Sequence, residues 1–234
     1  MKDFSKLEKK IEVEFSNQDL LKSALVHRSY LNENPKFPLS HNERLEFLGD
    51  AVLEFSVTEY LFRKFSKKPE GELTNLRSSL VNSKTLSGLA EDLGLEEYLY
   101  LSKGERQDTG KARRQILANT IEALIGAIYL DKDYIKAKEF IGKKLLPLLP
   151  RIIKEELYLD SKSSLQEIIQ DKFRITPEYK VISETGPDHD RRFEVGIYLN
   201  KKLVAKGKGS SKQDAQMKAA EEALKVINKK DFSL

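Results

Sequence analysis

The sequence predicts an α+β protein of two domains, an all-helical domain followed by a small domain with the order α-β-β-β-α. Between residue 5 and about residue 155, apolar residues recur at spacings of three and four, the period of helices that pack on a core. Beyond residue 163 the pattern changes to a helix, three strand-like runs and a last helix. We therefore expect domains at 1–156 and 163–230, joined by a short linker at 157–162.

The helical pattern of the first domain falls into segments separated by breaks. The breaks lie at 32–42, 67–71, around Gly94 and at 104–111, where proline, glycine and polar residues gather. Ser40 or Asn42 is expected to cap the helix that begins near Glu43. The apolar residues that carry the pattern are Leu20, Leu21, Ala24, Leu25, Leu45, Leu48, Val52, Phe55, Leu76, Leu80 and the run 116–130.

The second domain reads as one antiparallel sheet between two helices. Turn-forming residues at 186–190 and 200–202 separate the strand-like runs. The predicted helices are 163–173 and 212–227, and the predicted strands are 177–186, 191–199 and 202–209.

Composition limits the chemistry that the chain can perform. The 234 residues include no cysteine, which excludes disulfides, thiolate zinc sites and cysteine nucleophiles. They include only three histidines, so a metal site built from several histidines is not expected. Any metal would be held by carboxylates, which favours a hard cation such as magnesium. No apolar run suggests a membrane span or a secretory signal, so we expect a cytoplasmic protein. The net charge of +4 is weak evidence for nucleic acid by itself.

Three acids share one face of the helix that begins near Glu43. Glu43, Glu46 and Asp50 stand at i, i+3 and i+7, which places them within an arc of about 60°. Carboxylates this close repel one another unless a cation or a basic group lies among them. A solvated acidic face is the alternative interpretation.

A second helix adds a carboxylate in apolar surroundings. The run 115–130 is almost entirely apolar, and its polar exceptions Gln115, Asn119 and Glu122 share one narrow stripe. A carboxylate on a buried helix needs a partner. That partner is either an arginine, Arg44 or Arg77, or a metal ion shared with the acids of the first helix. Magnesium in such a cluster would suit phosphodiester hydrolysis.

The run 42–51, Asn-Glu-Arg-Leu-Glu-Phe-Leu-Gly-Asp-Ala, resembles the signature of the ribonuclease III family, and 20–30, 70–81 and 116–131 resemble other segments of that family. The resemblance covers essentially the whole chain. It implies a homodimeric endoribonuclease that hydrolyses double-stranded RNA with magnesium, for which manganese can substitute. The products would carry 5′-phosphate and 3′-hydroxyl ends, and the substrates would be ribosomal, messenger and transfer RNA precursors.

The resemblance also implies roles for individual residues. It gives Asp50 and Glu122 catalytic roles, and Phe47 a contact with the partner subunit, although Phe47 taken alone could be a core residue. His27 is expected to be structural. The metal ligands would be Glu46, Asp50, Asn119 and Glu122, with Glu43 and Glu70 as accessory acids.

Asn119 departs from the family pattern, which has aspartate at this position. An asparagine carbonyl can bind a cation, but one negative charge is lost, so weaker metal affinity should follow. Two explanations stand: a substitution introduced to hold substrate uncut, or a native asparagine with reduced activity.

The second domain resembles the double-stranded-RNA-binding domain, which reads the A-form helix by shape across two minor grooves and the phosphates between them. Five lysines and no acid lie between Lys201 and Lys212, which a solvated lysine-rich edge strand would also explain. Gln213 and Gln216 stand where the family often has basic residues. The RNA-binding residues implied are Ser163, Gln166, Glu167 and Gln170 in the first helix, Pro187, Asp188 and His189 in the first hairpin loop, and Lys208, Ser210, Ser211 and Lys212 at the start of the last helix.

Two rival functions remain open from the sequence. One is a non-catalytic protein that binds double-stranded RNA, because Asn119 replaces a ligand. The other is a structural helical dimer with a solvated acidic face. Magnesium-dependent cleavage separates the first rival from the enzyme, and cation binding by the acids separates the second.

Overall fold

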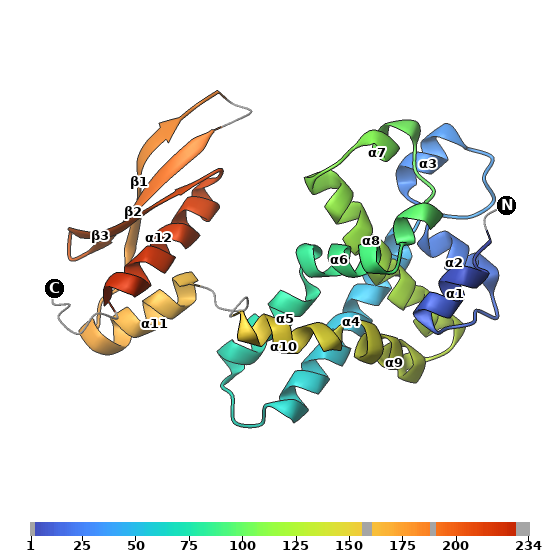
Figure 1. The fold of residues 1–234 in the computed structure, drawn as a ribbon, viewed down its shortest axis with the longest axis horizontal. Coiled ribbons are helices and arrows are strands. Elements are labelled where there is room, and N and C mark those ends of the chain that lie inside the picture. Colours follow the sequence, from blue (N-terminus) through green and yellow to red (C-terminus); the bar gives the residue numbers. More distant parts are fainter. Residues whose placement is uncertain (1–2, 156–160, 188–190, 228–234) are drawn as a thin grey trace. The chain divides into compact units, whose positions relative to one another are not determined.

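The computed structural model describes residues 3–155, 161–187 and 191–227. The chain divides into two compact units, Met1–Tyr158 and Leu159–Leu234 (Figure 1). The first unit is helical, and the second holds a three-stranded antiparallel sheet with two helices. The predicted fold class is therefore confirmed.

The helical unit is built from ten α-helices and two short 3-10 helices within its described residues. None of them is long and apolar enough to cross a membrane. Their bounds are α1 Ser5–Ile11, α2 Gln18–Ala24, α3 Arg28–Glu33, α4 Glu43–Lys64, α5 Glu70–Val81, α6 Ser83–Asp92, η1 Leu95–Tyr98, α7 Lys103–Gln107, α8 Lys111–Asp131, α9 Tyr134–Lys144, η2 Leu146–Leu148 and α10 Leu149–Lys154.

Helix α8 is the central element of this unit, and α2, α4, α6 and α9 pack around it (Figure 1). Between Ile116 and Ile128 its residues are buried, as its apolar sequence predicts, except for Asn119 and Glu122 of the polar stripe. The contact with α4 is the closest. A Cβ built at Gly49 of α4 would lie 1.7 Å from the Glu122 carbonyl oxygen, and one at Gly126 would lie 2.2 Å from the Leu45 carbonyl oxygen. The two helix backbones therefore touch, which only glycine at both positions permits.

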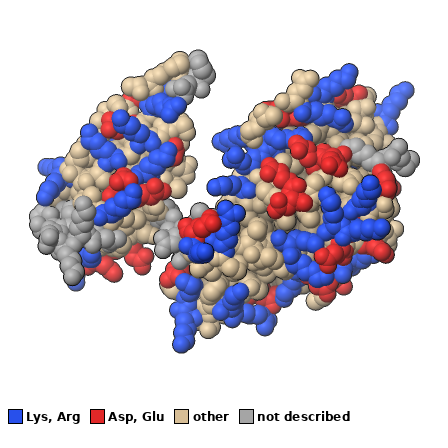
Figure 2. Space-filling view, in the orientation of Figure 1, with Lys and Arg blue, Asp and Glu red and all other residues tan. Residues whose placement is uncertain are grey.

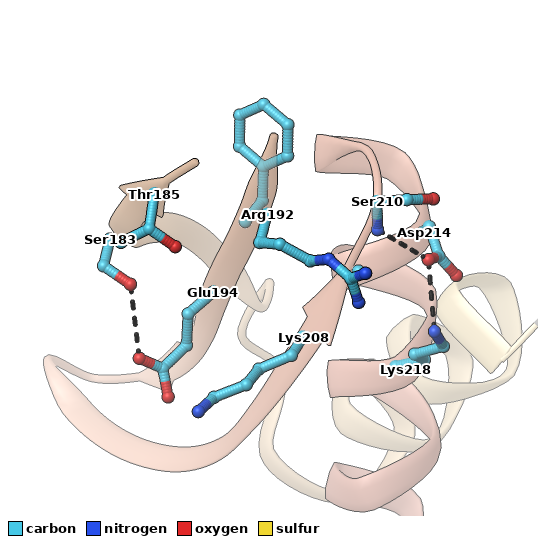
Figure 3. A pocket seen from close by; sticks show the side chains of 10 residues that line it. Ser183, Thr185, Arg192, Glu194, Lys208, Ser210, Asp214 and Lys218 are labelled. Carbon is cyan, nitrogen blue, oxygen red and sulfur yellow. Dashed lines mark hydrogen bonds and ion pairs between the residues drawn. The ribbon is translucent and has the colours of Figure 1, made fainter. Parts of the chain in front are cut away.

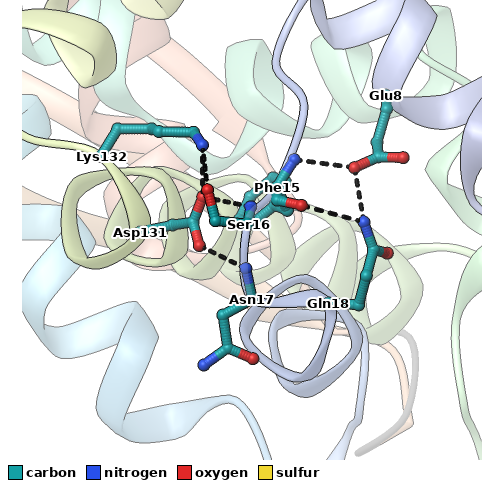
Figure 4. A network of polar contacts seen from close by, with 7 residues as sticks. All are labelled: Glu8, Phe15, Ser16, Asn17, Gln18, Asp131 and Lys132. Atoms are coloured by element: carbon teal, nitrogen blue, oxygen red, sulfur yellow. Dashed lines mark hydrogen bonds and ion pairs between the residues drawn. The ribbon is translucent and has the colours of Figure 1, made fainter.

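The N-terminal segment is tied to the end of α8 by a network of hydrogen bonds (Figure 4). The Asp131 carboxylate accepts from the backbone amides of Ser16, at 2.9 Å, and Asn17, at 2.7 Å. Glu8 of α1 in turn accepts from the amide of Phe15 at 2.8 Å. Satisfying these backbone groups holds the turn between α1 and α2 against the last residue of α8.

Helix α4 differs from the sequence prediction in two ways. Phe55, predicted to lie on its core side, is 61% exposed, and Phe47 is 83% exposed, so the core interpretation of Phe47 is wrong. Asn42 is the N-cap residue, but its side chain donates to the Ala24 carbonyl at 3.3 Å and does not cap α4. The helix has more apolar residues than one buried face can accommodate.

The second unit comprises α11 Ser161–Phe173, β1 Glu178–Thr185, β2 Arg192–Leu199, β3 Lys202–Gly209 and α12 Lys212–Ile227. The strand order is β1-β2-β3, and both helices pack on one another, with α12 covering β2 and β3. The predicted strands are confirmed, and α11 begins two residues before its expected start at 163. Asn200 and Lys201 adopt positive φ values of 47° and 70°, which closes the tight β2–β3 turn.

The glycine contact between α4 and α8 predicts a large difference between two alanine substitutions. Gly126→Ala should destabilise the protein by about 3 kcal/mol or more, because the new methyl group must push the two helices apart. The matched control is Gly88→Ala in α6, where a Cβ meets nothing within 4 Å. Gly88→Ala should stabilise by about 0.5–1 kcal/mol through reduced chain entropy. Urea denaturation measures both, and equal effects would contradict the role given to the crossing.

Candidate functional site

The acids of α4 lie beside the glycine crossing. Glu46 is half-buried and Asp50 is exposed, one turn apart on the same face of the helix. Burial raises the pKa of Glu46, and the carboxylates of Glu43 and Asp50 raise it further, while a hydrogen bond from Asn119 lowers it. The structure therefore brings Glu46 of α4 into contact with the polar stripe of α8.

Glu122 completes the cluster from α8. Its side chain is largely buried, and burial, followed by the charges of Asp50 and Glu46, raises its pKa to about 7. The arginine interpretation is wrong, because Arg77 pairs with Glu54 at 3.3 Å and no arginine pairs with Glu122 within the described residues. Glu122 thus faces two carboxylates with no basic partner among those residues.

Asn119 is held in one orientation by two neighbours. Gln115, one turn earlier on α8, donates from Nε2 to Asn119 Oδ1 at 2.6 Å. The Asn119 side-chain amide also faces the Glu46 carboxylate, where its hydrogen bonding lowers the pKa of Glu46. The amide hydrogens of Asn119 therefore face the acids, and its carbonyl oxygen faces Gln115.

The donor chemistry of this cluster fits a hard divalent cation. Three carboxylates and one amide oxygen are the ligand types that magnesium and manganese prefer. A largely buried carboxylate that meets only like charges is stabilised by a cation. As the side chains stand, no group of three or more His, Cys, Asp or Glu residues in the described ranges is arranged to hold a metal ion. Cation binding therefore requires side-chain rotation within the cluster.

The two expected accessory acids lie in different surroundings. Glu43 begins α4 and lies 3.6 Å from Arg28 and 3.7 Å from His41. Its charge still raises the pKa of Glu46, so it belongs to the edge of the cluster. Glu70 begins α5, accepts a hydrogen bond from Thr74 at 2.8 Å, and is not among the groups that shift the pKa of Glu46 or Glu122.

Two other expectations concern His27 and Phe47. His27 caps α3 and its Nδ1 lies 2.8 Å from Ser29 Oγ, which also accepts from the Ser102 amide. These contacts agree with a structural role. Phe47 projects from α4 into solvent beside the acids.

The expected RNA-binding residues at the start of α12 gather at one end of the second unit. Lys208, Ser210, Ser211 and Lys212 are all exposed. Ser211 Oγ caps α12 by accepting from the Asp214 amide at 3.1 Å, and Asp214 accepts from the Ser210 amide at 3.0 Å. The positive end of the α12 dipole and two lysines therefore stand together, which favours phosphate.

A pocket of about 580 Å³ adjoins this end of the sheet (Figure 3). Arg192, Lys208 and Lys218 line it together with Glu194 and Asp214. The sequence patterns did not single out Arg192 or Lys218. Their only sequence signals are the pair of arginines at 191–192 after the hairpin loop and a lysine one turn after Asp214. Lysine and arginine side chains also spread over much of the surface of this unit seen in Figure 2.

The structure describes only some of the RNA contacts expected in α11 and in the first hairpin loop. Gln166, Glu167 and Gln170 lie on the exposed side of α11, and Pro187 is exposed two residues beyond β1. Ser163 belongs to α11, but the structure does not describe its side chain. Asp188 and His189 lie outside the described residues. The lysines of β3 lie on an edge strand, as the alternative interpretation of that run expects.

Two family models match the chain. The Ribonuclease-III-like model matches residues 17–149, and the double-stranded RNA binding motif matches residues 161–227. A protein named Ribonuclease 3 from a Nitratiruptor species is 44% identical over 227 residues, which cover 97% of this chain and 98% of that protein. Ribonuclease 3 of Streptococcus pneumoniae is 43% identical over 218 residues, which cover 93% of this chain and 94% of that protein.

A solved structure resembles the helical unit. It is the nuclease domain of ribonuclease III from Campylobacter jejuni, which is 40% identical with a TM-score of 0.57. The match covers 63% of this chain and 99% of that one. The Campylobacter domain is described as structurally flexible in a region involved in dimer formation.

The raised pKa of Glu122 predicts how metal-free stability depends on pH. The folded protein binds this proton more tightly than the unfolded chain, so stability falls as pH rises from about 4.5 towards 7 and stays low above it. In chelator at pH 8, Glu122→Gln should therefore stabilise the protein by about 1–2 kcal/mol, allowing for solvent screening. The gain should disappear near pH 4.5. Melting temperatures across pH measure this, and a gain that is independent of pH would refute the electrostatic cause.

Proposed function

The chain belongs to the ribonuclease III family and is an endoribonuclease for double-stranded RNA, and from this premise we propose that it hydrolyses its substrate with magnesium. The products would carry 5′-phosphate and 3′-hydroxyl ends. Manganese should substitute, because it accepts the same oxygen donors. The substrates proposed are structured precursors of ribosomal, messenger and transfer RNA in the cytoplasm.

One observation carries the magnesium proposal: Glu122 is largely buried against Asp50 and Glu46, and no described basic residue pairs with it. Glu46, Asp50, Asn119 and Glu122 would hold the cation. When bound, the cation would lower the pKa of a water molecule and neutralise charge on the scissile phosphate. The chain's own residues keep the acids on two rigid helices, and the glycine crossing sets how closely those helices approach.

The second unit would contribute most of the affinity for double-stranded RNA. Lys208 and Lys212 with the N-terminus of α12 would contact phosphates, and the exposed polar side chains of α11 would meet a minor groove. Such contacts read the shape of the duplex and not its sequence. The enzyme would therefore bind many duplexes and depend on its nuclease unit for the position of the cut.

We further propose that two copies form a homodimer in which each cuts one strand. Phe47, Phe55 and Phe62 of α4 are 83%, 61% and 70% exposed, which is unusual for large apolar side chains on one helix. A second copy would cover such a surface. The Campylobacter nuclease domain, with its region of dimer formation, supports this proposal.

A second candidate function follows from Asn119. Its carbonyl oxygen is engaged by Gln115, and its amide hydrogens face Glu46. In this state the chain has three acids where the family has four, and it could bind duplex RNA while cutting it slowly. Binding is the same in both cases, so only cleavage distinguishes them.

Restoring the fourth carboxylate should increase cleavage. Asn119→Asp should lower the magnesium concentration that gives half-maximal cleavage by about tenfold, because a charged ligand replaces a neutral one. The assay is cleavage of a labelled duplex over a magnesium series. Single-stranded RNA of the same sequence is the control substrate. No gain for Asn119→Asp would show that asparagine does not impair the site.

The proposed phosphate contact at Lys212 can be tested by salt dependence. Lys212→Ala should weaken duplex RNA binding by about three- to tenfold and reduce the salt slope by about one unit. Lys225→Ala is the matched control, since Lys225 lies near the other end of α12 and pairs with Glu222 at 2.6 Å. Both are measured by fluorescence anisotropy in chelator at several salt concentrations. Equal losses in the two variants would remove Lys212 from the interface.

A further inference from the structure

The orientation of the Asn119 side chain depends on a residue that no ligand set includes. An amide offers a cation only its carbonyl oxygen, because its nitrogen carries two hydrogens and no available lone pair. The Asn119 Oδ1 atom accepts from Gln115 Nε2 at 2.6 Å. As the structure stands, the only side-chain atom of Asn119 that could bind a metal is turned along α8 towards Gln115.

The opposite orientation is unfavourable in the metal-free cluster. Rotating the amide by half a turn would place Asn119 Oδ1 against the Glu46 carboxylate, and two acceptors would face one another. The same rotation would bring the Asn119 amide hydrogens against the donor of Gln115, so the Gln115 amide would have to rotate as well for a hydrogen bond between them to form again. Two neighbours on two helices therefore favour the same orientation, with the hydrogens towards the acids.

A cation bound at Glu46 would reverse which end of the Asn119 amide is favoured next to that carboxylate. A metal ion at Glu46 would be repelled by amide hydrogens and attracted by the carbonyl oxygen. For Asn119 to become a ligand, its amide must rotate and both hydrogen bonds must break. The bond to Glu46 is lost in any case when a cation takes that carboxylate. The bond from Gln115 must break, or form again with both amides reversed, and this cost belongs to Gln115 alone.

We propose that Gln115 is a positioning residue that holds Asn119 away from the metal and thereby weakens cation binding by this chain. The proposal rests on the proposed metal centre formed by Glu46, Asp50, Asn119 and Glu122. It applies only while residue 119 is an amide. A carboxylate at 119 has two equivalent oxygens, so a donor at 115 would engage one and leave the other for the cation.

The difference between an amide and a carboxylate at position 119 can be tested by a double-mutant cycle. The quantity measured is the affinity for manganese and not the rate of cleavage. Gln115→Leu removes the donor at similar size. In the chain with Asn119 it should tighten manganese binding by about two- to fivefold, the effect of one exposed hydrogen bond. In the Asn119→Asp background the same change should alter affinity by less than about twofold. Isothermal titration with manganese, in the full-length protein without RNA, gives the four dissociation constants.

A variant with only acceptor atoms at position 115 provides a second test. Gln115→Glu accepts from the Asn119 amide hydrogens and so favours the orientation with its carbonyl towards the acids. It also lowers the net charge by one, a change that Arg114→Gln on the adjacent exposed position of α8 matches. Gln115→Glu should tighten manganese binding more than Arg114→Gln. Gln107→Leu, an exposed glutamine of α7, controls for loss of an amide as such.

The outcomes separate this inference from the function on which it rests. If Gln115→Leu leaves manganese affinity unchanged with Asn119 present, or changes it equally in the Asn119→Asp background, the positioning role is overturned and the metal centre stays intact. No manganese binding by any variant, Asn119→Asp included, would overturn the metal centre and the inference together. Coupling between positions 115 and 119 in the predicted direction would support both.

Discussion

The close contact between α4 and α8 at Gly49 and Gly126 is the constraint on which the site depends. Gly49 stands between Glu46 and Asp50 of α4, and a Cβ there would collide with the backbone of Glu122 itself. The residue that packs the helices is therefore adjacent to the residues that would carry the chemistry. Any side chain at the crossing would separate the helices and move Glu122 away from Glu46 and Asp50. The acids are held together by helix packing, not by attraction among themselves.

In this arrangement two contributions to the free energy of folding oppose one another. Burial of apolar surface around α8 stabilises the helical unit, and three neighbouring carboxylates destabilise it in the absence of a cation. Asn119 alters the balance, because an amide removes one charge and donates to Glu46. The change that weakens a metal ligand therefore also relieves repulsion in the metal-free protein. Catalytic sites commonly show such a conflict between stability and function.

The sequence predicted the fold class and the helices and strands in chain order, because helical and strand periods are local properties. Periodicity left two partners open for Glu122, an arginine or a metal ion shared with the acids of α4, because contacts between helices are not local. It did not predict the exposure of Phe55, because an apolar surface for a partner has the same period as an apolar surface for a core. It could not predict the direction of the Asn119 amide, which depends on a neighbour one turn away and on a carboxylate of another helix. Arg28 and His41 beside Glu43 were missed for the same reason, since they come from other segments.

The two units differ in how they tolerate departures from the family pattern. Phosphate binding by α12 and β3 is a sum of many weak charge contacts, and Lys208, Lys212 and Lys218 remain where Gln213 and Gln216 are neutral. Losing one charge among many changes affinity by a small factor. A metal site has few ligands, each fixed in direction, so one neutral ligand changes a large share of its charge. Asn119 therefore affects the function of this chain more than Gln213 and Gln216 of α12 together, although it is a single departure from the family pattern in a site that is otherwise intact.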